Sequence, residues 1–172
     1  MAAELEYAKK VLKLLKVPIG KLSLNKNNTV VQTSGTESIV GLVSIILSAL
    51  RQTNTLYKYE NPIEYLEIEQ WIDYSNTTLK QNVSLIKNIL PELNIILEAR
   101  TYIVSTRLTI GDIILYYALN SVMKNLNPYE KAQYLNVSRW FDNIQQDISI
   151  RQDLQLINFN TNYLLSTAVL SH

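Results

Sequence analysis

The side chains that most often carry covalent or metal chemistry are nearly absent from this sequence. It has no cysteine, and its only histidine, His172, is the last of 172 residues. A Ser-His-Asp or Cys-His relay needs an imidazole held by the fold, and terminal residues are usually mobile. Thiolate catalysis and tetrahedral zinc sites need cysteine or several histidines, and the four glycines form no phosphate-binding loop. We therefore expect no cofactor and no metal.

Carboxylates are the remaining candidates for acid–base chemistry. Four of them follow Asn61 on one predicted helix: Glu64, Glu67, Glu69 and Asp73. Two carboxylates with shifted pKa values could act as a general acid and base. Charges at this spacing are more often the solvated face of a helix, and we favour that interpretation. The chain is therefore expected not to be an enzyme.

The charge balance bears on the partners that the chain could attract. Sixteen Lys and Arg residues stand against 15 Asp and Glu residues, a net charge of +1. So small a charge does not drive long-range attraction to phosphates, and direct nucleic-acid binding is not expected. A membrane span of about 20 apolar residues and a signal peptide are both missing from the pattern. We expect a cytoplasmic protein, with the nucleus as an alternative, and its apolar composition predicts a protein partner.

The first 59 residues predict a small α/β unit. Residues 2–16 have apolar side chains at helical spacing, and Pro18 and Gly20 end this amphipathic helix. Residues 29–33 and 36–40 are short β-branched runs on either side of a Ser-Gly turn, which predicts an antiparallel hairpin.

The following segment, residues 41–51, is apolar almost all round and is interrupted only by Ser44 and Ser48. A helix of this kind is covered on two sides. Its own small sheet can cover one side. The other side is either a binding surface or is covered by later helices, and the sequence leaves both open.

Everything after Tyr59 reads as helical, and three start signals are visible. Residues 61–64 and 127–130 both read Asn-Pro-x-Glu, in which Asn caps the helix, Pro fits its first turn and Glu reaches back to the cap. Thr109 and Asp112 have the spacing of a capping box and open an apolar run that we expect to be the buried central helix.

One further helix is expected to begin near Asn88, with Pro91 in its first turn, and to end near Arg100; if it begins earlier, Pro91 must kink it. Aromatic residues gather around the helix after the first start signal, at Tyr57, Tyr59, Tyr65, Trp71 and Tyr74. Such rings are enriched at protein interfaces, but a tyrosine-rich edge of the core would give the same pattern.

Two stretches resemble known families. Residues 109–117, Thr-Ile-Gly-Asp-Ile-Ile-Leu-Tyr-Tyr, resemble the capping box and core helix of the glutathione-transferase C-terminal domain. Residues 134–141, Tyr-Leu-Asn-Val-Ser-Arg-Trp-Phe, and the residues that follow to position 152 closely resemble the smallest auxiliary subunits of the animal multi-tRNA-synthetase complex, the elongation factor one epsilon-type family. This resemblance covers most of the chain.

The resemblance implies a glutathione-transferase-like fold that is mostly α-helical. Residues 1–59 would form a small, truncated α/β thioredoxin-like N-terminal domain, and residues 60–172 an all-helical C-terminal domain. The opening helix has no strand before it, so the first strand of a complete thioredoxin-like domain would be missing. Thr29 stands where transferases have a cis-proline, and Gly41-Leu42 replaces the pair that holds glutathione, which argues against transferase activity.

The resemblance also implies a non-catalytic scaffold of the multi-tRNA-synthetase complex with two docking surfaces. The partners would be the transferase-like domains of methionyl-tRNA synthetase and glutamyl-prolyl-tRNA synthetase, beside other subunits of the complex. The first surface would be the one through which transferases dimerise, so the isolated chain could form a homodimer. At least one of Leu42 and Ile46 should lie uncovered there. The predicted partner-binding residues are Leu42, Ile46, Ala49, Leu50, Trp71, Tyr74, Asn136, Ser138 and Arg139.

Other interpretations stay open. Arg139 suits bidentate or stacked contact with a partner, but a surface arginine can equally pair with a neighbouring acid. A degenerate glutathione-dependent enzyme or small-ligand binder would need a polar pocket with backbone donors between the two domains. Binding of tRNA in its own right is opposed by the near-neutral charge.

Overall fold

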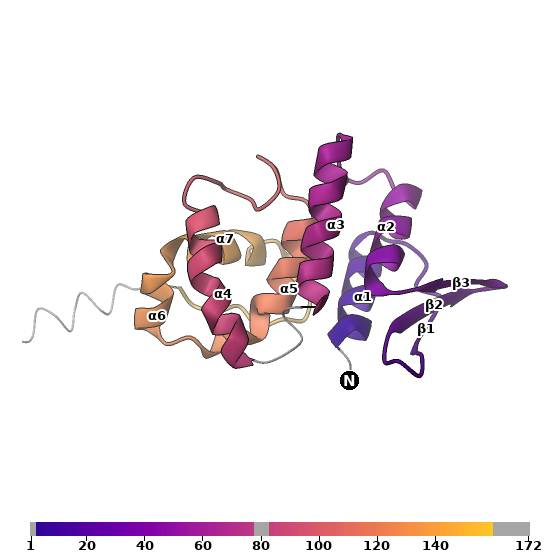
Figure 1. Ribbon diagram of the computed structural model, residues 1–172, viewed down its shortest axis with the longest axis horizontal. Helices are drawn as coiled ribbons and strands as arrows, with labels where there is room; N and C mark the ends of the chain where they lie inside the picture. Colours follow the sequence, from indigo (N-terminus) through magenta and orange to yellow (C-terminus); the bar gives the residue numbers. More distant parts are fainter. Residues whose placement is uncertain (1–2, 78–82, 160–172) are drawn as a thin grey trace, which may run out of the picture.

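A computed structural model describes residues 3–77 and 83–159 of the chain. In chain order the elements are α1 (Ala3–Leu14), β1 (Lys21–Leu24), β2 (Val30–Ser34), β3 (Glu37–Val40), α2 (Leu42–Gln52), α3 (Pro62–Thr77), α4 (Val83–Ile96), α5 (Ile110–Asn125), α6 (Pro128–Gln133), α7 (Leu135–Gln145) and α8 (Ile148–Arg151). The sheet lies at one end of the molecule beside α1 and α2, and α4, α6 and α7 lie toward the other end (Figure 1). No helix within the described ranges is long and apolar enough to span a membrane.

The sheet has three antiparallel strands in the order β1-β2-β3. The predicted hairpin is confirmed as β2 and β3, in which Gln32 pairs with Ile39. Strand β1 was not predicted, because four residues next to an Asn-rich turn give little periodicity, and it pairs Leu24 with Val30. The Gln32 side chain is buried, and its amide is satisfied there because it donates to the carbonyls of Pro18 and Ile19 at 3.3 and 3.1 Å.

Helix α1 joins the sheet to the helical part of the chain. Its buried apolar residues are Ala8, Val11 and Leu12. On another side Lys10 is nearly buried and forms an ion pair with Asp153, and the Gln152 amide donates to the Lys10 carbonyl at 2.8 Å. The segment after α7 is therefore tied back onto the first helix.

The start of α3 has the predicted cap, with one change. The Asn61 side chain accepts the Glu64 N–H at 2.9 Å, but the Glu64 carboxylate accepts the N–H of Glu60, one residue before the predicted cap. Helix α4 begins at Val83 and not near Asn88, so Pro91 lies within it, as in the alternative of an earlier start, and the helix ends at Ile96 and not near Arg100. Tertiary packing of the apolar face of α4 outweighs the local cost of the proline.

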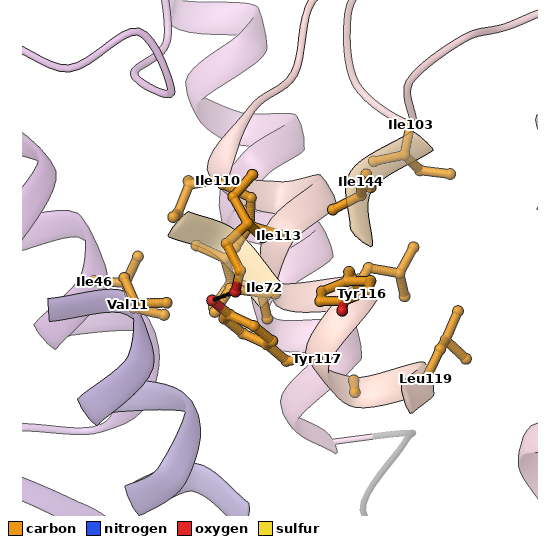
Figure 2. Packing of buried hydrophobic residues seen from close by; sticks show 14 of the residues in the cluster. Val11, Ile46, Ile72, Ile103, Ile110, Ile113, Tyr116, Tyr117, Leu119 and Ile144 are labelled. Carbon is orange, nitrogen blue, oxygen red and sulfur yellow. Dashed lines mark hydrogen bonds between the residues drawn. The ribbon is translucent and has the colours of Figure 1, made fainter. Parts of the chain in front are cut away.

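Helix α5 is the buried centre of the helical part, as predicted. One hydrophobic core runs from α1 and α2 through α3 and α5 to α7, where Val11, Ile46, Ile72, Ile113 and Ile144 are all buried (Figure 2). All three strands lie before residue 41, but because this core is continuous the division into residues 1–59 and 60–172 stays a prediction.

Candidate interaction surfaces

The predicted capping box at the start of α5 is confirmed, and it extends beyond the helix. Asp112 is fully buried and accepts the N–H and hydroxyl of Thr109 at 3.0 and 2.8 Å. Its other oxygen accepts the Ile103 N–H at 2.7 Å and the Trp140 indole N–H at 3.0 Å. Burial raises the pKa of Asp112, and its hydrogen-bond donors oppose that rise. All of its partners belong to the chain itself, so this carboxylate joins α5, the preceding loop and α7.

The four partner-binding residues predicted on α2 are buried inside the chain. Leu42, Ile46, Ala49 and Leu50 are each at most 2% exposed. The expectation that Leu42 or Ile46 lies uncovered was therefore wrong. The sheet covers one side of α2, and α1 and α3 cover the others, which was the alternative that the sequence left open.

Trp71 and Tyr74 are half-buried and lie edge to face, with ring centroids 5.4 Å apart. The Trp71 Cβ lies 3.6 Å from the position that a Cβ on Gly111 of α5 would take. Burial, and secondarily the charge of Glu92 on α4, raise the pKa of Tyr74. Trp71 therefore lies on the α5 side of α3, and both rings pack at the edge of the core.

An exposed groove does lie between α2 and α3, formed by other residues than those predicted. It has a volume of about 330 Å³ and is lined by Val43, Leu66, Glu69, Gln70 and Asp73. Leu66 is 55% exposed. We call this the α2–α3 groove. Its lining combines two apolar residues, Val43 and Leu66, with two acidic ones, Glu69 and Asp73.

The second predicted surface is built around the contact between α4 and the start of α7. The Asn136 N–H donates to the Asn94 side chain at 2.9 Å, and the Asn136 amide donates to the Asn94 carbonyl at 3.0 Å. Ser138 does not face a partner, because it is buried and its hydroxyl donates to the Lys131 carbonyl at 2.8 Å. Its assignment as a partner-binding residue is corrected accordingly.

Arg139 is exposed, yet its guanidinium is engaged within the chain. One nitrogen donates to the carbonyls of Leu97 and Arg100, at 2.8 and 2.9 Å, just beyond the C-terminal end of α4. The arginine therefore binds backbone carbonyls, and the neighbouring acid considered from the sequence is not its partner. A cation at this end of a helix is also favoured by the helix dipole.

Two apolar side chains at this second surface were missed from the sequence. Ile95 and Leu135 are 70% and 64% exposed, and they adjoin the bonded asparagines Asn94 and Asn136. The buried apolar residues of α7 are Val137, Trp140, Phe141 and Ile144, and Leu135 does not share their side of the helix. An apolar residue off that side was the sequence signal for an exposed side chain. We call Ile95, Leu135, Asn136 and Arg139 the α4–α7 surface.

Val30 follows Thr29, the residue that stands where transferases have a cis-proline, and both of its backbone groups are paired within the chain. The N–H of Val30, next to Thr29, donates to the Glu4 carboxylate at 3.0 Å, and the carbonyl of Val30 accepts the Gly41 N–H at 2.8 Å. Gly41 itself adopts φ 92° at the start of α2, a conformation that favours glycine. Both backbone groups of Val30 are therefore already paired.

A larger hollow, of about 610 Å³, lies where the linker between α2 and α3 meets Arg107, Leu108 and Asp147. Arg107 forms ion pairs with Glu60 and Glu64, at 2.8 and 2.7 Å, so its charge is balanced within the chain. Over the described part of the chain, no group of three or more acidic or histidine side chains could hold a metal ion.

Comparison with known proteins supports the architecture and identifies the family. Solved structures with the same fold include a glutathione S-transferase of Vibrio parahaemolyticus, with a TM-score of 0.70 at 17% identity over 88% of this chain and 92% of that one. A structure of yeast aminoacyl-tRNA synthetase sub-complexes matches with a TM-score of 0.59 at 16% identity, over 99% of this chain and 89% of that one. The fold is therefore glutathione-transferase-like.

Sequence comparison is more specific. A family model described as nuclear-export cofactor Arc1p matches residues 64–148. The bifunctional glutamate/proline–tRNA ligase of Cricetulus griseus is 31% identical over 106 residues, which are 61% of this chain and 7% of that protein. Eukaryotic translation elongation factor 1 epsilon-1 of Homo sapiens is 35% identical over 170 residues, 97% of this chain and 98% of that protein. The chain therefore belongs to the family of eukaryotic translation elongation factor 1 epsilon-1 proteins.

Proposed function

We propose that the chain is a non-catalytic scaffold that associates with aminoacyl-tRNA synthetases. The observation that carries this proposal is the pair of exposed surfaces with apolar residues on different helices, the α2–α3 groove and the α4–α7 surface. Similarity to part of a glutamate/proline–tRNA ligase, and to a yeast synthetase sub-complex, supports synthetases as the class of partner. Two surfaces allow one small domain to hold two partners at once.

The partners that we propose are the transferase-like domains of methionyl-tRNA synthetase and of glutamyl-prolyl-tRNA synthetase. We propose that the α2–α3 groove takes the role of the surface through which transferases dimerise, with a second copy of the chain as an alternative occupant. The α4–α7 surface would hold the other partner. We propose the cytoplasm as the site of function, with the nucleus as an alternative.

A glutathione-dependent enzyme is the competing function, and the contacts of Val30 argue against it. A peptide ligand that paired with the backbone at Val30, next to Thr29, would have to displace Glu4 from the Val30 N–H. Calorimetric titration with glutathione should give no saturable heat. Saturable binding would favour the enzyme instead.

Three matched substitutions test the two-surface arrangement. Leu66→Arg should weaken the affinity of the chain for one synthetase domain, and Leu135→Arg should weaken its affinity for the other. Each affinity should fall by about 30-fold, as expected when a charge enters the apolar centre of an interface. Leu56→Arg is the control, because Leu56 is 89% exposed and lies outside both surfaces. Calorimetry with the two isolated synthetase domains gives the affinities, and sedimentation of the free chain reports self-association. Unchanged affinity in both surface variants would contradict the proposal.

A further inference from the structure

The net charge of +1 conceals a strong division of charge along the chain. Residues 1–59 contain eight Lys and Arg against three acids, whereas residues 60–172 contain eight against twelve. The two parts therefore carry +5 and −4. Between Glu6 and Glu37 lie 30 residues with six lysines and no acid at all. The argument from net charge against binding of nucleic acid does not apply to a chain whose charge is divided in this way.

Five of these lysines are free on the surface of α1 and β1. Lys9 and Lys13 are four residues apart and lie on one side of α1, and Lys16 lies two residues beyond its C-terminal end. Lys21 begins β1, which packs beside α1, and Lys26 lies in the turn after it. All five are exposed, and none forms an ion pair or hydrogen bond with any residue that the structure describes. We call these five residues the lysine face.

The sixth lysine differs from the other five. Lys10 points to another side of α1, where it is nearly buried and pairs with Asp153 and, at 3.6 Å, with Glu6. The positive charge of Lys13 also contributes to the lowered pKa of Asp153. Apart from this partial compensation at Lys13, the lysine face is not neutralised.

We propose that the lysine face binds the phosphate backbone of RNA, with tRNA as the species that the proposed association with synthetases would bring to it. The choice of tRNA rests on that proposed function, whereas the charge and geometry of the face do not. Lysine ammonium groups act as point charges toward phosphate and lack the planar fork of arginine. Binding is therefore independent of base sequence and sensitive to salt.

The structure favours RNA over an anionic membrane. A membrane-binding helix presents an apolar side next to its basic side. The apolar residues of α1 face the core instead, where Ala8, Val11 and Leu12 are fully buried and Leu15 is 6% exposed. Neither α1 nor β1 contributes to the α2–α3 groove or the α4–α7 surface, so RNA and the protein partners would contact different residues.

Fluorescence anisotropy of the full chain with labelled tRNA tests the proposal. The wild-type chain should bind tRNA at 50 mM KCl. Its affinity should fall by about 40-fold at 200 mM KCl if three phosphates are contacted. The triple variant Lys9→Gln, Lys13→Gln, Lys16→Gln should bind at least about tenfold more weakly at 50 mM, with a shallower salt dependence. Lys13→Glu should also weaken binding. Lys124→Glu is its control, because Lys124 is exposed on α5 within the acidic part of the chain.

Several results would overturn the proposal. These are absence of tRNA binding by wild type at 50 mM KCl, equal binding by the triple variant, or equal weakening by Lys124→Glu. Binding to phosphatidylserine vesicles without binding to tRNA would assign the face to a membrane. Displacement of tRNA by poly-glutamate at equal charge concentration would assign it to an acidic protein. The triple variant should keep wild-type affinity for the synthetase domains, so failure of the scaffold proposal and failure of RNA binding are separate outcomes.

Discussion

Asp112 illustrates how a single buried carboxylate can serve structure and not chemistry. Its pKa is raised by burial, a feature that active-site acids share. Every donor that it accepts from nevertheless belongs to the same chain, from Thr109, Ile103 and Trp140. The sequence predicted the contact with Thr109 from spacing. Spacing could not reveal Trp140, because that contact forms only when α7 packs against α5.

Replacing Asp112 by Ala should lower the free energy of unfolding by about 2 to 4 kcal/mol, since three buried N–H groups lose their acceptor. Asn61→Ala is the matched control at an exposed cap, where water can substitute, and should cost about 1 kcal/mol. Urea denaturation followed by circular dichroism measures both. Equal losses in the two variants would mean that the buried contacts of Asp112 add nothing.

Arg139 was predicted to contact a partner, and the structure shows its guanidinium engaged within the chain. The Arg139 guanidinium binds the carbonyls of Leu97 and Arg100. Arg139→Ala should therefore lower the free energy of unfolding by about 1 to 2 kcal/mol, and with it the thermal midpoint. Arg139→Lys should recover part of this, since lysine retains the charge near the end of α4. Thermal melts of the free variants give the result. A midpoint equal to wild type in Arg139→Ala would show that the intramolecular contact is dispensable for stability. Arg139 would then be available to bind a partner.

At the scale of elements, α2 and α4 departed from expectation for the same reason. The residues of α2 were apolar on all sides, and only the positions of α1 and α3 decided which of them remained exposed. Helix α4 extends through Pro91 although local preference would start it later. In both helices packing with distant parts of the chain outweighed local sequence.

Pro91→Ala should therefore raise the free energy of unfolding by about 1 to 3 kcal/mol, because a proline within a helix lacks the N–H that would bond the preceding turn. Pro91 is exposed, so the change removes little packing. Pro128→Ala is the matched control, because Pro128 is the first residue of α6, where the missing N–H has no cost. Denaturation midpoints compare the two. Destabilisation by Pro91→Ala would show that the proline fits its turn better than alanine does.

At the scale of the whole molecule, the contact of Lys10 with Asp153 joins the first helix to the segment after α8. The hydrogen bond from Lys10 lowers the pKa of Asp153. A lowered pKa in the folded state stabilises the fold above the unfolded value of about 3.9, and this contribution is lost as the pH falls through the folded pKa. The contact should therefore matter at neutral pH and vanish in acid.

Asp153→Asn should lower the thermal midpoint at pH 6 to 7, because it leaves Lys10 nearly buried without its main counter-charge. The difference from wild type should shrink as the pH falls below 4 and should be lost once the pH is below the lowered pKa of Asp153. Asp73→Asn is the control, since Asp73 is exposed and forms no ion pair within the described residues. Calorimetric scans across this pH range make the comparison. A difference that persists unchanged at pH 3 would rule out the ion pair as its cause.

The sequence by itself determined the features that depend on neighbours along the chain. These are the hairpin at residues 30–40, the caps at Asn61, Thr109 and Asn127, the buried nature of α5, and a family resemblance that comparison confirmed. Helical and strand periodicity and capping act over a few residues, so they can be read locally. Tertiary structure alone decided which apolar residues stay exposed. Burial depends on elements far apart in sequence, so Leu42 and Ile46 became core while Leu66, Ile95 and Leu135 remained at the surface.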